Sequence, residues 1–336
     1  MPYPADQTIG ATILIADDQA ANRELLEALL TADAYQVIAV SDGEEALSAL
    51  ARNQIDLVLL DVMMPRLNGF EVCERIKANP ETDLIPAILV TSLADKEDRI
   101  RGIKAGADDF LTRPVDRAEL LARVRSLLKL KMRTDELERA ESVLFTLARS
   151  IEGKDPYTHG HCERLADYSA RLGSEVGLPE NQITALRRAG VVHDVGKVAV
   201  PDSILLKPRG LSPEEWKLMR EHPVVGERIC APLKSFRLVL PIIRHHHEKY
   251  DGSGYPDGLR GEAIPITARV LQIVDVYDAL TTDRPYRKAL STSDAIRTMK
   301  EEVARGWWDA DIFRQLERLV RNGTAQFRSS ASAAGS

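Results

Sequence analysis

Short, continuously apolar runs alternate with amphipathic segments through the first 130 residues of the chain. The clearest runs, ILIA, IDLVLL and AILV, are apolar at every position, as in parallel strands that are covered on both faces. We expect strands near residues 12–16, 35–40, 55–60, 87–91 and 109–111. Helix-like segments accompany them near 20–31, 43–52, 68–78, 95–105 and 116–130. Five βα units predict a flavodoxin-like α/β fold, doubly wound around a five-stranded parallel sheet.

The rest of the chain follows helical spacing almost throughout and predicts an all-α second domain. One long helix over 117–151 is expected to lead into it. Further helical periodicities cover 161–176, 181–195, 212–231, 235–247, 265–280, 291–304 and 309–321. The expected organisation is an N-terminal extension (1–10), a first domain (11–130), a helical linker (131–151), a second domain (152–321) and a disordered polar tail (322–336). The linker fits a dimer seam and a solvated helix equally well.

Bulk composition excludes several classes of protein. The net charge of -6, from 45 basic and 51 acidic side chains, argues against direct DNA binding. No apolar run approaches the roughly 20 residues of a membrane span, and the N-terminus lacks a signal-peptide pattern. The cysteines, Cys73, Cys162 and Cys230, are far apart and form no CxxC pair. We therefore expect a cytoplasmic protein without disulfides and without membrane contact.

Carboxylates follow two of the predicted strands. Asp17 and Asp18 come after the first strand, and Asp61 comes after the third. Because the carboxyl ends of parallel strands meet at one edge of the sheet, neighbouring first and third strands would bring these carboxylates together. Such a cluster suits Mg²⁺ and allows one Asp to attack a phosphoryl group. Thr91 and Arg113, at the ends of the fourth and fifth strands, could bind that group.

The strings ILIADD, LVLLDVMMPRLNGFEVC, ILVTS and GADDFLTRPV resemble the response-regulator receiver family over roughly residues 11–130. The resemblance implies that Asp61 is phosphorylated by a cognate histidine kinase. It also implies that Asp17, Asp18 and Asp61 support Mg²⁺, and that Thr91 and Phe110 are the switch pair.

One position departs from the receiver pattern. Arg113 stands where the family has a lysine, and the three residues Thr91, Phe110 and Arg113 are those expected to respond to phosphorylation. Arginine keeps the positive charge, but its rigid fork is not equivalent to a compact ammonium group.

All seven histidines lie between residues 159 and 247, which first suggests a metal site: His159, His161, His193, His222, His245, His246 and His247. The string ALRRAGVVHDVGK puts His193 and Asp194 late on an apolar helix, where a buried charge must be paired or bound to metal. Asp194 could bridge two metals while His193 binds one of them. Lys197 would lie near the same helical face and contact a phosphate or a bridging hydroxide.

Asp275 makes an independent case, because it interrupts an otherwise apolar helix in RVLQIVDVYDAL. Asp278 is expected to be a structural partner rather than a ligand. His161 and Arg164, three residues apart, can face one site.

His222 precedes Pro223 at an expected helix start, where its side chain could turn inward. Within the triple of residues 245–247, neighbouring side chains diverge by about 100° around a helix, so two ligands and one spare are expected. Nitrogen and oxygen ligands without thiolate suit iron, manganese, nickel or catalytic zinc.

The strings KDPYTHGHCERLADYS, HDVGK, EHPVVG, HHEKYDGSGYPDGL, VDVYDAL and DRPYRKA resemble the HD-GYP phosphodiesterases over about residues 140–320. The resemblance implies seven metal ligands: His161, His193, Asp194, His222, His246, His247 and Asp275. Lys197 would lie beside them, with His245 spare and His159 outside the motif. Some members bind a third metal through a glutamate four residues before the first histidine; Tyr157 stands there, which favours two metals.

The same resemblance implies a substrate, cyclic di-GMP, hydrolysed to pGpG and in some members on to GMP. Arg284, Arg287 and Lys288 would hold substrate phosphates, next to the loop that carries Tyr255. We expect in-line attack of a metal-bridging hydroxide on the phosphodiester, assisted by Lys197 and Arg284. His193 and Asp194 are counted with Lys197 as catalytic.

Three other interpretations stay open at this point. The same centre could hydrolyse another cyclic or linear dinucleotide. The domain could bind cyclic di-GMP, or proteins of cyclic di-GMP signalling, with little turnover. Phosphorylation could chiefly switch a homodimer.

Overall fold

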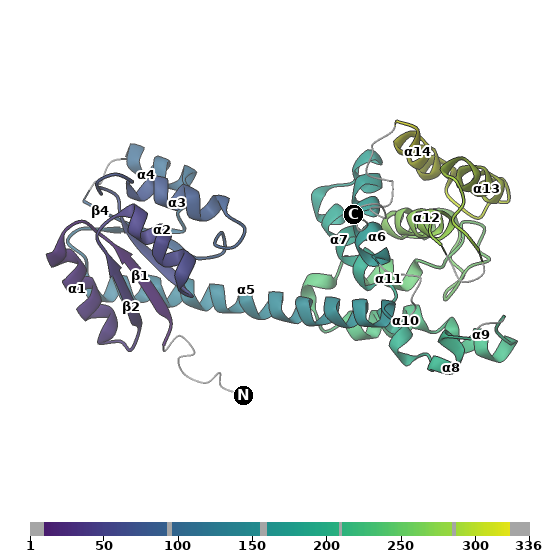
Figure 1. Cartoon of the computed structure of the whole chain (residues 1–336), viewed down its shortest axis with the longest axis horizontal. Coiled ribbons are helices and arrows are strands. Elements are labelled where there is room, and N and C mark those ends of the chain that lie inside the picture. Colours follow the sequence, from purple (N-terminus) through teal and green to yellow (C-terminus); the bar gives the residue numbers. More distant parts are fainter. Residues whose placement is uncertain (1–9, 93–95, 155–159, 208–209, 284–286, 323–336) are drawn as a thin grey trace, which may run out of the picture. The chain divides into compact units, whose positions relative to one another are not determined.

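The computed structural model describes residues 10–92, 96–154, 160–207, 210–283 and 287–322. Its contacts divide the chain into two compact units, one that ends at Ala140 and one that begins at Glu141. Helix α5 (Arg117–Glu152) is continuous, beginning in the first unit and ending in the second (Figure 1). The expectation of a long helix between the two domains is confirmed.

The first unit is the predicted doubly wound α/β fold. Its strands are β1 (Thr12–Ala16), β2 (Gln36–Val40), β3 (Leu57–Asp61), β4 (Ala87–Thr91) and β5 (Asp109–Thr112). They form one parallel sheet in the order β2-β1-β3-β4-β5, so β1 and β3 are hydrogen-bonded neighbours. The strand expected at 55–60 is observed as Leu57–Asp61. Asp61 is therefore the last residue of the strand and does not follow it.

Helices cover both faces of this sheet: α1 (Ala20–Thr31), α2 (Gly43–Arg52), α3 (Gly69–Ala78), α4 (Lys96–Lys104) and the first part of α5. Along β1, Leu14 packs into the core under α2 and α3, whereas Ile13 and Ile15 pack under α1 and α5. Successive strand side chains point to opposite faces, so a strand between two helical layers must be apolar at every position.

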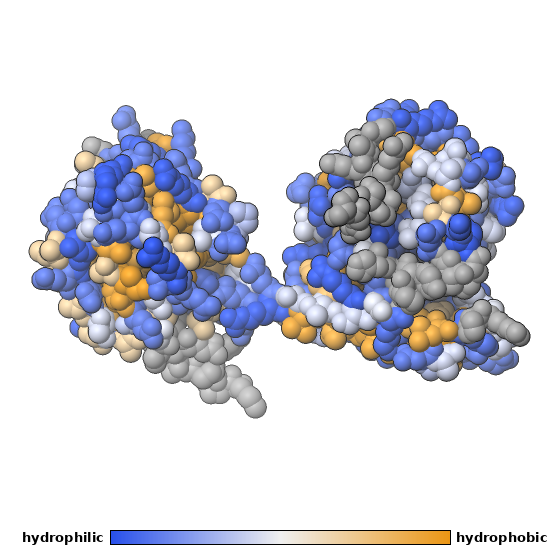
Figure 2. All heavy atoms as spheres, in the orientation of Figure 1, coloured by the Kyte–Doolittle hydropathy of each residue, from blue (hydrophilic) through white to orange (hydrophobic). Residues whose placement is uncertain are grey.

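The described part of the second unit is helical, as predicted. Its α-helices are α6 (His161–Glu175), α7 (Glu180–Val192), α8 (Asp202–Leu205), α9 (Pro213–Met219), α10 (His222–Cys230), α11 (Leu240–His245), α12 (Ile266–Thr281), α13 (Thr292–Ala304) and α14 (Ala310–Arg321). Short 3₁₀ turns are η1 (Val195–Ala199), η2 (Lys234–Phe236) and η3 (Gly261–Ala263). Hydrophilic side chains cover most of the visible surface of both units (Figure 2). Among the described helices, none combines the length and apolarity that crossing a bilayer requires.

Three predicted helices end or break earlier than their apolar spacing indicated. The segment expected over 181–195 stops at Val192, and η1 follows. A side-chain carbon added to Gly196 would lie 1.9 Å from the His222 carbonyl oxygen, so η1 packs directly on α10. The segment over 212–231 divides into α9 and α10, and that over 235–247 shortens to η2 and α11. Packing between these short elements decides where each helix ends.

Candidate functional site

The carboxylates predicted in the first unit meet at the carboxyl edge of the sheet. Oxygens of Asp17, Asp18 and Asp61 lie within 4.8 Å of one another. Asp17 and Asp61 are buried, whereas Asp18 is exposed. The guanidinium of Arg113 donates to Asp17 and, at 2.9 Å, to Asp61. One arginine thus bridges the two buried carboxylates.

Burial raises the pKa of Asp61, and the nearby charge of Asp17 raises it further, while Arg113 acts in the opposite direction. Thr91 is buried at the end of β4. Phe110 is half-buried on β5, with the Cζ atom of Arg99 5.9 Å from its ring centre. The structure therefore places the predicted switch residues on the two strands that follow Asp61 in the sheet.

In the second unit, Asp194 lies between two groups of histidines. One group combines it with His161 and His193, and the other combines it with His222, His246 and His247. Its Oδ2 atom lies 3.3 Å from His193 Nε2, and its Oδ1 atom lies 3.2 Å from His222 Nε2. The two carboxylate oxygens therefore face different groups, which is the geometry of a carboxylate that bridges two cations.

Lys197 donates to Asp194 Oδ2 at 2.5 Å from the turn that follows. Burial acts to raise the pKa of Asp194, but the charges of Lys197 and His193 outweigh it and hold that pKa well below its ordinary value. Asp194 is therefore ionised. Its buried Oδ1 atom accepts no hydrogen bond from the described residues, so this oxygen is free to bind a cation.

In each of four histidines, a contact made by the Nδ1 atom fixes the orientation of the ring. The Nδ1 atoms of His193, His222 and His246 lie 3.1, 2.8 and 2.6 Å from backbone carbonyl oxygens, and that of His161 lies 2.7 Å from Asp278. Because these oxygens only accept, each Nδ1 carries a proton, which leaves Nε2 as the nitrogen through which a neutral ring can bind a cation. This arrangement of a second partner behind each ring is typical of histidine ligands to metals.

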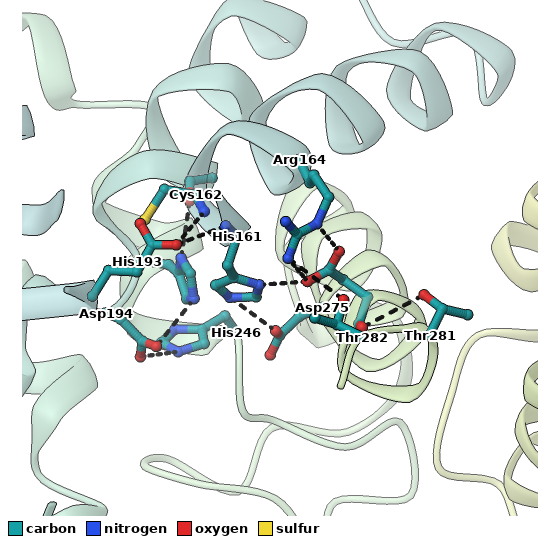
Figure 3. A network of polar contacts seen from close by, with 12 residues as sticks. His161, Cys162, Arg164, His193, Asp194, His246, Asp275, Thr281 and Thr282 are labelled. Carbon is teal, nitrogen blue, oxygen red and sulfur yellow. Dashed lines mark hydrogen bonds and ion pairs between the residues drawn. The ribbon is translucent and has the colours of Figure 1, made fainter. Parts of the chain in front are cut away.

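Asp275 projects from α12 toward His161 (Figure 3), and Asp278, on the same helix, contacts Nδ1 of that ring. Asp275 Oδ1 lies 3.5 Å from His161 Nε2, on the opposite side of the ring from Asp278. Arg164 donates to Asp278 at 2.6 and 3.0 Å. Burial acts to raise the pKa of Asp278, but its hydrogen bonds to His161 and Arg164 lower it. Asp278 therefore orients His161 as an ionised acceptor.

A residue that the sequence analysis missed lies behind His161. Glu152, the last residue of α5, accepts the backbone amides of His161 at 2.6 Å and Cys162 at 3.3 Å. The residue before α6, Gly160, provides no side-chain cap. Glu152 thus caps α6, which begins at His161, and it lines a cavity with His161 and Lys197. The sequence gives only a weak signal for this cap, because Glu152 and His161 belong to two separate helices.

The glycine-rich loop after α11 packs through Tyr255 on the second group of histidines, which is the part of the candidate metal cluster that contains His247. Its ring stacks on His247, with ring centres 4.9 Å apart and an angle of 27° between planes. Glu248, fully buried, accepts the amides of Asp257 and Leu259 at 2.7 and 3.1 Å and so anchors the loop. The sequence analysis did not single out Glu248, although it directly follows the histidine triple.

His245 points away from the cluster: its Nδ1 lies 3.8 Å from Glu248 and 3.5 Å from Asp257. Arg287 donates to the Ala279 carbonyl at 2.6 Å, at the end of α12, and Lys288 is exposed. Their role toward substrate stays a prediction. The predicted Arg284, together with His159 and Tyr157, lies outside the described residues.

Comparison with known proteins gives two family matches. Residues 13–125 match the response regulator receiver domain, and residues 146–312 match the HD domain. The chain is 36% identical over 311 residues to the cyclic di-GMP phosphodiesterase response regulator RpfG of Xanthomonas campestris, covering 86% of this chain and 82% of that protein. The chain belongs to the HD-domain response regulators.

Two other relatives of this HD-domain response regulator differ in how much of the chain they cover. A cyclic di-GMP phosphodiesterase of Thermotoga maritima is 33% identical over 345 residues, covering 94% of this chain and 92% of that protein. The 3'3'-cGAMP-specific phosphodiesterase 2 of Vibrio cholerae is 39% identical over 160 residues, covering 47% of this chain and 31% of that protein. An HD domain implies dependence on divalent metal, and a receiver domain implies Mg²⁺ and a phosphorylating kinase.

Proposed function

We propose that this HD-domain response regulator is an HD-GYP-type phosphodiesterase that hydrolyses cyclic di-GMP to pGpG. The observation that carries the proposal is Asp194, whose two oxygens face two separate histidine groups. The names of the two full-length relatives support the substrate. The string HHEKYDGSGYPDGL supports the subtype.

The residues proposed to hold two cations are His161, His193, Asp194, His222, His246, His247 and Asp275. Iron or manganese are the proposed cations, and nickel and zinc are also compatible with these nitrogen and oxygen atoms. When bound, two divalent cations supply an activated water and stabilise charge on the phosphodiester oxygens.

The protein's own residues prepare this centre. Lys197 holds Asp194 in place through its 2.5 Å hydrogen bond, and its positive charge lies where a phosphate oxygen can approach. Asp278 orients His161, and the ring of Tyr255 stacks on that of His247. Arg284, Arg287 and Lys288 are proposed to bind the remaining phosphate.

We propose that Asp61 accepts a phosphoryl group from a histidine kinase, with Mg²⁺ held by Asp17, Asp18 and Asp61. Arg113 already binds both buried carboxylates, so a phosphoryl group on Asp61 must change that bridge. Thr91 and Phe110, on the adjacent strands, would respond to the change.

A second candidate substrate is 3'3'-cGAMP. The relative of that name matches 160 residues of this chain. Both cyclic dinucleotides present the same phosphodiesters to the metal cluster and differ in one base.

The test is anaerobic purification with metal analysis, followed by hydrolysis of both dinucleotides and chromatography of the products. Reactions with and without an acyl-phosphate analogue on Asp61 measure regulation. Asp194→Asn should abolish turnover while the far-ultraviolet circular dichroism spectrum stays unchanged. Retained turnover in Asp194→Asn would refute this site.

A further inference from the structure

Arg220 lies between α9 and α10, two residues before His222. Its Cζ atom is 5.4 Å from the centre of the Tyr255 ring and 5.9 Å from the centre of the Trp216 ring. Tyr255 stacks in turn on His247 of the metal cluster. These side chains continue from the metal cluster to the surface, where Trp216 is 45% exposed.

The guanidinium of Arg220 lies over two aromatic rings at cation–π distance, instead of against a carboxylate. Among the described residues, no acidic side chain lies within ion-pair distance of it. By contrast, Arg244 binds Asp257 at 2.7 Å and Arg269 binds Asp309 at 2.6 Å. A guanidinium in cation–π contact keeps the donors along its edge available to a ligand.

Rings and a free guanidinium edge suit a purine base. Bases stack on aromatic side chains and on arginine planes. Guanine presents two acceptors, O6 and N7, to the fork of an arginine, whereas adenine replaces O6 with an amino donor. An arginine edge therefore favours guanine.

We propose that Trp216 and Arg220 form the base-binding wall of the substrate site and that Arg220 selects guanine over adenine. The inference rests on the proposed hydrolysis of a cyclic dinucleotide. With a phosphodiester at the metal cluster, the base of the same nucleotide extends outward past Tyr255 and meets Arg220.

The decisive variant is Arg220→Gln in the full-length, metal-loaded protein, assayed on cyclic di-GMP and cyclic di-AMP. Glutamine matches the N6 and N7 edge of adenine. The ratio of kcat/KM for cyclic di-GMP over cyclic di-AMP should fall roughly 10–100-fold. Trp216→Ser should lower kcat/KM for both dinucleotides, and Trp216→Phe should restore most of the loss.

Arg228→Gln is the matched control, because Arg228 is also exposed and lies on α10, which follows Arg220. It should leave both the ratio and the metal content unchanged. An Arg220→Gln variant that weakens both dinucleotides equally, or neither, would overturn the proposal.

A second measurement separates this proposal from the proposed hydrolysis. Dissociation constants of both dinucleotides are measured by calorimetry on the metal-stripped full chain, where turnover plays no part. In one outcome, wild type hydrolyses neither dinucleotide and yet binds cyclic di-GMP more tightly than Arg220→Gln does. That result would refute the proposed hydrolysis and support the proposed base-binding wall. If the preference for cyclic di-GMP is equal in wild type and Arg220→Gln, or if wild type binds neither dinucleotide, the wall is overturned.

Discussion

The Nε2 atoms of His222 and His246 lie 3.3 Å apart, while the Nδ1 atom of each ring donates to a backbone carbonyl. When both rings are neutral, two lone pairs therefore face each other in a buried space. Burial, the largest cause, holds the pKa of His246 well below its ordinary value, so protonation of that ring does not relieve the repulsion. A divalent cation between the rings relieves it, because both lone pairs then bind the same cation.

His246→Ala should therefore weaken metal binding by at least about 100-fold, as measured by competition with a chelating dye. The neighbouring His245→Ala is the control, because His245 faces Glu248 and Asp257 and not the cluster. Equal metal loss in both variants, measured per folded protein, would remove the basis for assigning His246 and not His245 as a ligand.

Asp278→Asn should weaken metal binding by about 10–100-fold without abolishing it. The amide still accepts a hydrogen bond from His161, but it lacks the negative charge that makes the ring a stronger ligand. The half-buried Arg164 also loses its charged partner. Metal titration against a chelator checks the result, with the exposed pair of Asp294 and Arg297 supplying the control Asp294→Asn. Unchanged affinity in Asp278→Asn would show that this carboxylate serves only the fold.

Glu152→Ala should lower the free energy of unfolding of the second unit by about 1 kcal/mol, because α6 loses its cap. Glu152→Gln should cost less, since its carbonyl oxygen can still accept the two amides. All three tryptophans of the chain, Trp216, Trp307 and Trp308, lie in this unit, so their fluorescence during urea unfolding reports on it alone. Glu138→Ala, exposed on the same helix, should have no effect; a loss as large as that of Glu152→Ala would exclude a specific cap.

Asp61→Asn should stabilise the first unit at neutral pH by on the order of 1 kcal/mol. Burial and the charge of Asp17 raise the pKa of Asp61 in the folded state. The folded state therefore holds this proton more tightly than the unfolded chain, and the ionised carboxylate costs stability as pH rises. The advantage of the variant should be absent below the ordinary carboxyl pKa, grow through the folded pKa and be full above it.

Hydrogen exchange of the β1 and β3 amides at several pH values measures this difference. The exposed Asp83→Asn, in the same unit, serves as the control and should show no such pH dependence. An advantage of Asp61→Asn that is constant with pH would point to packing instead of ionisation.

The sequence alone determined the layered architecture of the first unit. Strands apolar at every position must lie between two helical layers, and the observed alternation of Leu14 and Ile15 between two cores follows from that requirement. The carboxylates Asp17 and Asp61 were predictable for the same reason, because strand ends in a parallel sheet share one edge. The HDVGK string likewise located Asp194 and its neighbours, since a buried charge needs a partner.

The tertiary structure decided how these groups face one another. His222 and His246 are 24 residues apart and meet only because α10 and α11 pack together. Glu152, at the end of α5, accepts the amide of His161, the first residue of α6. Arg220, between α9 and α10, lies over the ring of Tyr255 in the loop after α11. Gly196 allows η1 to lie directly against α10, because a side-chain carbon there would clash with the His222 carbonyl. Helical periodicity specifies which face of a helix is buried, but not which other helix covers it, and these contacts depend on that pairing.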